Sequence, residues 1–301
     1  ALPISVQGSK YWFNCNPDGP YHWFKINWIN KSTGYLGKEK TAKVRAEAAA
    51  KGLEAGLKNI LYVHFTMDDN LSLSEEIKAR YRSMYTGVVF KRYILGLWAM
   101  AEGIIYDMFD ADKHVQKITD FFRCLKDGGR YVSCDYGTQN ATVFLLWNKG
   151  NNGKWYCVRE YYYSGRAKGK QKTDGEYADD FEKWLDGVPI RAVIVDPAAA
   201  SFIAELRKRG YRVLKADNDV EDGIREVASM LNMGLLVFCD TCINTIMEFG
   251  SYIWDEKAAQ QGEDRPVKEN DHAMDAVRYF VYTILSKRTG RVKNKAKYGF
   301  D

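Results

Sequence analysis

The segment GGRYVSCDYG at residues 128–137 predicts a buried strand that ends in an acidic residue. Its centre combines Tyr131 and Val132 with the small apolar Cys134, and glycines lie on both sides, a pattern typical of strands. Asp135 follows where the strand should reach solvent. One interpretation is a turn aspartate that caps the backbone of the next loop. The other is a carboxylate that the sheet holds at its edge for chemistry.

Two further acids occupy comparable positions. RAVIVDPAAA, residues 191–200, predicts a second strand that ends in Asp196, and its nearly continuous apolar run indicates burial on both faces. Asp275 lies in NDHAMDAVRY, residues 270–279, near the start of an apolar helix. Three acids so far apart in sequence can meet only in the fold, and oxygen ligands of this kind suit Mg²⁺ or Mn²⁺.

Such a cluster predicts phosphodiester chemistry with two divalent ions about 4 Å apart. We assign Asp135 as the bridging ligand, with Asp196 and Asp275 as outer ligands. His272 lies three residues before Asp275 and therefore on the same helix face, where it would act as a ligand or a proton shuttle. The alternative for His272 is a histidine that only hydrogen-bonds nearby backbone at the helix start.

The composition predicts a folded, soluble chain of roughly two domains, with 46% apolar and 14% aromatic residues. No run of about eighteen apolar residues and no signal pattern is visible, so we expect a cytosolic protein without a membrane segment. The net charge of +5 is compatible with a polyanionic partner but is also common elsewhere. Six scattered cysteines are interpreted as small buried hydrophobes, although CDTC at residues 239–242 could imitate a redox dithiol or half of a zinc site.

The order of elements predicts an α/β domain over residues 116–288. Two strands at residues 140–149 and 154–164 follow Asp135 and must pair antiparallel, because the turn GNNG joins them closely. Helix, strand, helix, strand, helix and a closing helix come next, and Thr173 with Glu176 forms a capping box for the first of these helices. We expect a mixed sheet with helices on both faces, whose strand-end acids converge at one edge.

The N-terminal region, residues 1–115, is predicted to be a partial α/β unit with a linker. YWFNCNPDGPYHWF at residues 11–24 is interpreted as an aromatic strand that runs into a turn, and an exposed, alanine-rich helix and the strand NILYVHFT follow it. Ser72 with Glu75 would open the next helix. Residues 289–301 form a basic tail.

The polar segment GRAKGKQK at residues 165–172 approaches a phosphate-binding loop without matching it. It is one residue short of the motif, and Gln171 replaces the hydroxyl that would hold Mg²⁺. We expect a basic surface segment whose Arg166, Lys168, Lys170 and Lys172 contact nucleic-acid phosphates.

Taken in order, Asp135, IVDPAAA and NDHAMDAVRY resemble the ribonuclease H-like nuclease domain of phage terminase large subunits, over most of residues 121–288. DHAMDAVRY is the most specific part. The resemblance implies that the metal-binding acids of the family correspond to Asp135, Asp196 and Asp275, with its histidine at His272. FNCNPDGPYHW is similar to the coupling segment at the end of the ATPase core, with Asn16 as the coupling residue. YILGLWAMAEGIIYDMF is similar to the passage from ATPase to nuclease. Neither a Walker A loop nor a Walker B strand is present in the chain, so its first part resembles only the trailing part of a P-loop ATPase domain.

This resemblance implies a metal-dependent endonuclease that cuts concatemeric double-stranded DNA with two Mg²⁺ or Mn²⁺ ions. It also implies a portal protein and a small terminase subunit as partners, and the cytoplasm of the infected bacterial host as location. We expect no ATP binding and no ATPase activity from this chain. The alternatives are an ATP-driven packaging translocase, which would describe an intact parent protein, and a non-enzymatic module that docks DNA or a portal ring.

Overall fold

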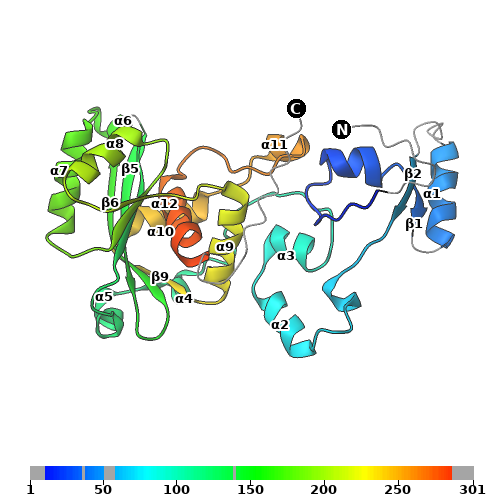
Figure 1. The fold of residues 1–301 in the computed structure, drawn as a ribbon, viewed down its shortest axis with the longest axis horizontal. Coiled ribbons are helices and arrows are strands. Elements are labelled where there is room, and N and C mark those ends of the chain that lie inside the picture. The colour runs from blue at the N-terminus through cyan, green and yellow to red at the C-terminus, as the bar shows by residue number, and fades with distance from the viewer. Residues whose placement is uncertain (1–10, 36–37, 51–57, 138–139, 287–301) are drawn as a thin grey trace.

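The computed structural model describes residues 11–35, 38–50, 58–137 and 140–286. At one end of the molecule, β1 (Ser32–Tyr35) and β2 (Lys58–Tyr62) form a parallel two-stranded sheet, and α1 (Lys38–Ala50) connects them in sequence (Figure 1). The alanine-rich helix and the strand after it are therefore confirmed. This β-α-β unit is too small to bury a core by itself.

Two expectations for the N-terminal region are wrong. Residues 11–19 form neither strand nor helix, so the predicted aromatic strand is absent, and Pro17 within this segment lacks the amide that a strand residue would donate. The helix α2 (Glu75–Ser83) is capped by Ser74, which accepts from the amide of Ile77, and not by Ser72. Short elements complete the region: η1 (Lys25–Ile29), η3 (Met67–Asp69) and α3 (Gly87–Tyr93).

A seven-stranded mixed sheet forms the larger part of the molecule. Its three central strands pair antiparallel as expected, and the strands outside them join in parallel. Along the sheet the order is β3 (Val115–Gln116), β9 (Leu236–Cys239), β6 (Trp155–Ser164), β5 (Ala141–Lys149), β4 (Tyr131–Asp135), β7 (Ala192–Val195) and β8 (Val213–Lys215). The strands β3 and β9 are additional to those predicted, because two residues show no periodicity and a short apolar run after a helix is ambiguous.

Helices cover both faces of this sheet, which confirms the predicted fold class. α7 (Asp174–Leu185) and α8 (Ala200–Lys208) lie on one side of β5 and β6, and α9 (Val220–Asn232), α10 (Ile243–Ser251) and α12 (His272–Phe280) lie on the other (Figure 1). The capping box of Thr173 and Glu176 opens α7 as predicted. Shorter helical segments are α4 (Ala111–His114), α5 (Ile118–Phe121), η4 (Phe122–Cys124), α6 (Gly165–Lys168), α11 (Glu256–Gln260) and η5 (Val281–Leu285).

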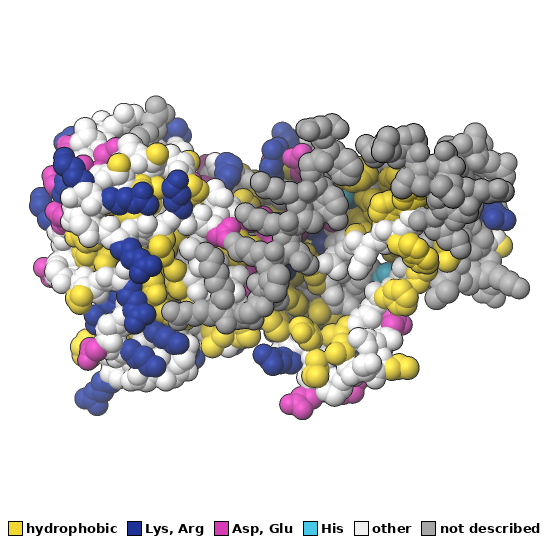
Figure 2. Space-filling view, viewed as in Figure 1, with side chains coloured by type: hydrophobic (Ala, Val, Ile, Leu, Met, Phe, Trp, Pro, Cys, Tyr) yellow, Lys and Arg dark blue, Asp and Glu magenta, His cyan; other side chains and the backbone are white. Residues whose placement is uncertain are grey.

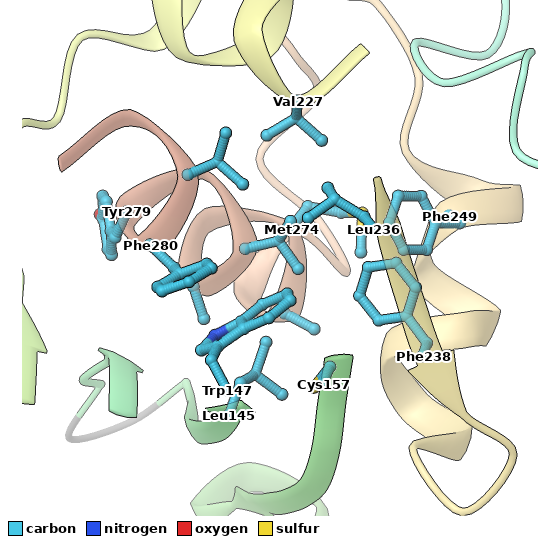
Figure 3. Close-up of a cluster of buried hydrophobic side chains, with 14 of the residues drawn as sticks. Leu145, Trp147, Cys157, Val227, Leu236, Phe238, Phe249, Met274, Tyr279 and Phe280 are labelled. Carbon is cyan, nitrogen blue, oxygen red and sulfur yellow. The ribbon is translucent and has the colours of Figure 1, made fainter. Parts of the chain in front are cut away.

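The core between α12 and the sheet holds that helix in place. Trp147 of β5 stacks on Phe280 with ring centroids 4.4 Å apart and donates its indole N–H to the hydroxyl of Ser133 on β4 (Figure 3). Every residue of α12 after His272 is buried. The side chains at the start of α12 therefore have a set position relative to the end of β4.

Polar contacts join the N-terminal region to the larger part. Arg92 of α3 is buried, forms ion pairs with Asp264 and Asp18, and donates to the carbonyl of Ala99. Tyr93 accepts a hydrogen bond of 2.7 Å from Arg225 of α9. The division at residues 115 and 116 stays a prediction.

The six cysteines are free thiols, and Cys157, Cys239 and Cys242 are buried among apolar side chains. Within the described ranges, no helix is both long and apolar enough to cross a membrane.

Candidate active site

Two strand ends place Asp135 and Asp196 side by side. β4 and β7 are parallel neighbours with Cys134 opposite Val195, so the next residue of each strand is one of the two acids. Side chains alternate along a strand, and Tyr131 and Ser133 point towards α12, so Asp135 points that way too. Asp196 follows the same parity on β7. The pairing of these strands therefore brings two carboxylates to one edge of the sheet.

The helix α12 completes the group from the opposite side. His272, Asp275 and Tyr279 occupy one helix face because they are three and then four residues apart. Nδ1 of His272 lies 2.9 Å from Oδ2 of Asp135, and the hydroxyl of Tyr279 donates to Oδ2 of Asp196 at 2.5 Å. The four residues predicted from the sequence thus line one cavity of about 360 Å³.

A buried arginine holds Asp275. Nη2 of Arg278 donates to Oδ1 of Asp275 at 2.8 Å, and Nη1 donates to the carbonyls of Asn218 and Asp219 at 2.8 and 3.1 Å. Its methylenes lie so close to Gly223 of α9 that a β-carbon there would stand 2.5 Å from Cγ. Arg278 therefore ties Asp275 to the start of α9, a role that DHAMDAVRY alone does not reveal.

A fourth carboxylate faces the same cavity and was not predicted from the sequence. Asp271 is 5% exposed, and its Oδ2 lies 3.2 Å from Nζ of Lys268. The same amine lies 3.6 Å from Oδ2 of Asp275. The only sequence signal is the spacing of four residues between Asp271 and Asp275, which places both on one helix face.

Glu248 of α10 supports the helix that carries these groups. Its Oε2 accepts from the amides of Ala273 and Met274 at 2.7 and 3.2 Å, and its Oε1 accepts from the hydroxyl of Tyr162 at 2.8 Å. Burial raises the pKa of Glu248 to about 7. An acid at the start of α12 also interacts favourably with the helix dipole.

The electrostatics of Asp135 reflect the crowding of like charges. Burial raises its pKa to about 6, with a further contribution from the charge of Asp275, while the hydrogen bond from His272 acts in the opposite direction. Burial lowers the pKa of His272, but the hydrogen bond to Asp135 and its charge outweigh burial, so this pKa lies above its usual value. The protonation of each of these two side chains therefore depends on that of the other.

The donor set fits a hard divalent cation in its chemistry. Four carboxylates and one imidazole line the cavity, and oxygen donors of this type suit Mg²⁺ or Mn²⁺. Each carboxylate contacts a protein partner in this arrangement. Within the described part of the chain, no three His, Cys, Asp or Glu side chains converge closely enough to hold one ion together.

The basic segment at residues 165–172 exposes three of the four side chains that were predicted to contact phosphates. Arg166, Lys168 and Lys170 are exposed, and Gly165–Lys168 forms the short helix α6 and not a phosphate-binding loop. Lys172 instead forms an ion pair with Asp180, and its amine lies 4.1 Å from the ring centre of Tyr163. Its amine therefore has partners within the protein, and its contact with phosphates stays a prediction.

Comparisons with known proteins agree with this architecture. The family model for the "Terminase RNaseH-like domain" matches residues 134–283, which include all four predicted site residues. The large terminase subunit of Escherichia phage T5 is 26% identical over 252 residues, which are 79% of this chain and 55% of that protein. The large terminase of a thermophilic bacteriophage, solved in complex with ADP, is 51% identical, with a TM-score of 0.79, over 94% of this chain and 64% of that one. The structure of the same terminase in complex with ATP-gamma-S is 52% identical, also with a TM-score of 0.79, over 93% of this chain and 64% of that one.

The chain spans little more than half of the T5 protein and less than two thirds of the thermophilic phage protein. Its larger part has the family's sheet with helices on both faces, and its sequence match begins one residue before Asp135. On this combination of fold, site and sequence, the chain belongs to the family of phage terminase large subunits, and residues 134–283 are its RNase H-like domain.

Proposed function

We propose that this chain is a metal-dependent endonuclease that cuts concatemeric double-stranded DNA during viral genome packaging. The observation that carries the proposal is the cavity in which two strand ends and the start of α12 gather four carboxylates and an imidazole. Lys268 and Arg278 also line this cavity and offset part of its negative charge, and a bound divalent cation would offset more of it. A site of this composition is therefore best explained by a function that requires the cation.

Asp135, Asp196 and Asp275 are the proposed ligands of two Mg²⁺ or Mn²⁺ ions, with Asp135 shared between them. Bound ions would polarise the scissile phosphate and lower the pKa of the attacking water. His272 holds a proton 2.9 Å from Asp135, where it can orient that carboxylate and exchange the proton with solvent. Arg278 orients Asp275 through its donated hydrogen bond.

The proposed substrate is recognised through its phosphates. Figure 2 shows Lys and Arg side chains gathered in a column on the part of the molecule that holds the seven-stranded sheet. Arg166 and Lys168 are exposed at the start of the basic segment that follows β6. Phosphate contacts carry no base information, so cleavage should depend little on DNA sequence.

The remaining assignments concern the setting of the reaction. We propose that the enzyme works in the cytoplasm of the infected bacterial host with a portal protein and a small terminase subunit. We further propose that this chain neither binds nor hydrolyses ATP, because no Walker A loop is visible in its sequence. Translocation by an ATP-driven motor would then belong to a longer protein.

The test is cleavage of plasmid DNA in Mn²⁺ by Asp135→Asn, Asp196→Asn and Asp275→Asn. Each change removes a charge and little volume, so we expect loss of cleavage with an unchanged circular dichroism spectrum. Asp240→Asn is the matched control, because Asp240 also follows a strand, β9, but lies outside the cavity. This variant should cleave DNA as the wild type does.

Mn²⁺ should also stabilise the folded wild type. At a concentration 100 times the Kd, its free energy of unfolding should rise by about 2.7 kcal/mol, which is measured as a higher melting temperature. Asp135→Asn should lose this effect. Wild-type cleavage by Asp196→Asn would refute the assignment of that residue. DNA binding without cleavage and without a Mn²⁺ effect in the wild type would favour the docking module.

A further inference from the structure

The start of α12 is capped in an unusual way. Asp271 occupies the N-cap position, where aspartate normally accepts a hydrogen bond from an amide two or three residues ahead, but its side chain caps no amide. Asp219 and Asp255, at the same position of α9 and α11, both accept such hydrogen bonds. Asp271 therefore differs from equivalent residues of the same protein.

Glu248 has taken over the capping of α12. Its Oε2 accepts from the amides of Ala273 and Met274, the second and third residues of the helix. These are the amides that an N-cap side chain would normally satisfy. Because Glu248 is only 4% exposed and its other oxygen accepts from Tyr162, the arrangement is buried and specific.

The backbone turns Asp271 away from the helix. Asn270 adopts a left-handed conformation with φ of 52°, which asparagine tolerates better than most residues. Asp271 follows with φ of −113° and ψ of 0°, outside the extended region typical of an N-cap residue. Its carboxylate consequently faces the cavity and does not reach back to the helix amides.

The released carboxylate lies among the groups of the proposed site. Oδ1 of Asp271 lies 4.0 Å from Nδ1 of His272, the nitrogen that contacts Asp135. Oδ2 lies 3.2 Å from Nζ of Lys268, which is also 3.6 Å from Asp275. Asp271 is thus close to both the strand-end acid and the helix acid, while only 5% exposed.

We propose that Asp271 is a fourth carboxylate of the divalent-cation site, and that Glu248 is the positioning residue that frees it by capping α12. This inference rests on the proposed function, because it concerns the same cavity. One carboxylate then stabilises the start of the helix, and the other serves the site.

The experiment measures Mn²⁺ binding to the whole chain by isothermal titration calorimetry, with the unfolding midpoint of the metal-free protein recorded for every variant. Asp271→Asn should lower the Mn²⁺ affinity by about tenfold or more, with a nearly unchanged midpoint because no helix amide loses its partner. Asp271→Ala should do the same. Asp255→Asn, a change at a helix N-cap outside the cavity, is the matched control and should bind Mn²⁺ as the wild type does.

Glu248 is tested with a pair of variants. Glu248→Gln keeps a carbonyl oxygen that can accept from the helix amides, so its affinity for Mn²⁺ should stay close to that of the wild type. Glu248→Ala removes the acceptor, so Asp271 should return to capping, and both the midpoint and the Mn²⁺ affinity should fall. Adding Asp271→Asn to Glu248→Ala should then cost little further affinity, because the two changes act on one interaction.

The outcomes distinguish this inference from the proposed function. Wild-type affinity in Asp271→Asn, with lost affinity in Asp135→Asn, overturns the role of Asp271 and leaves the proposed function intact. Wild-type affinity in both overturns the proposed function itself. A lower midpoint but wild-type affinity in Glu248→Ala shows that Glu248 only stabilises the helix and overturns its positioning role.

Discussion

Replacing Gly223 with alanine should destabilise the protein, although alanine is the better helix former. Gly223 lies in α9, where alanine would by itself contribute about 1 kcal/mol. A β-carbon at this position would stand 2.5 Å from Cγ and 2.7 Å from Cδ of Arg278. Such contacts require either the helix or the arginine to move.

Arg278 has little freedom to move. It is 2% exposed, and its guanidinium donates to Asp275 and to the carbonyls of Asn218 and Asp219. Overpacking of this kind typically costs about 1–3 kcal/mol, and the middle of that range exceeds the gain of about 1 kcal/mol in helix propensity. We expect a net loss of about 1 kcal/mol, or a midpoint lower by roughly 2–4 °C.

The assay is thermal unfolding followed by circular dichroism, with Gly250→Ala as the matched control. Gly250 is an exposed helical residue of α10, and no neighbouring atom lies within 4 Å of the point that a β-carbon would occupy, so alanine there should raise the midpoint. Gly223→Ala should also weaken Mn²⁺ binding, because a displaced Arg278 no longer orients Asp275. A stabilising effect equal to that of Gly250→Ala would refute the reasoning and show that Arg278 is free to rearrange.

Four other predictions concern the site and its surroundings. His272→Ala should lower the cleavage rate, retain Mn²⁺ binding and change the pH profile, and an unchanged profile between about pH 6 and 9 would make the histidine structural. Burial raises the pKa of Glu248 from 4.5 to about 7, so the native state binds a proton more tightly than the unfolded chain does. The stability that this protonation contributes is fully present below pH 4.5 and is lost as the pH rises towards 7. As the pH rises from 4.5 to 7, Glu248→Gln should therefore gain stability relative to the wild type, measured as the free energy of unfolding in urea. If the two proteins show the same dependence of this free energy on pH, the raised pKa of Glu248 is wrong. DNA binding should fall steeply with salt, and Arg166→Gln with Lys168→Gln should reduce the salt slope equally for unrelated DNA sequences, whereas a sequence-dependent loss would indicate base contacts. Cleavage should be unchanged by ATP, and any ATP turnover that disappears in Lys170→Ala would restore a nucleotide-binding role for that segment.

Local sequence patterns were sufficient for the strands that carry the site. A buried apolar run has a recognisable composition, so the ends of β4 and β7 and the acids after them could be predicted without tertiary information. The shared helix face of His272 and Asp275 follows from helical periodicity alone. The catalytic roles of these residues still await the tests above.

Contacts between distant segments account for what the patterns left out. Glu248 caps α12 from 25 residues away, and Arg278 reaches a carbonyl 60 residues away at Asn218. Neither partner has a local signature, since a glutamate in α10 and an arginine in α12 look like ordinary helix residues. The ion pair between Lys172 and Asp180 likewise has no signature in the sequence. Periodicity specifies which side of an element a residue occupies, whereas the packing of one element against another selects its partner. For Asp271, at the N-cap position of α12, that selection left the helix amides to Glu248 and the carboxylate to the cavity.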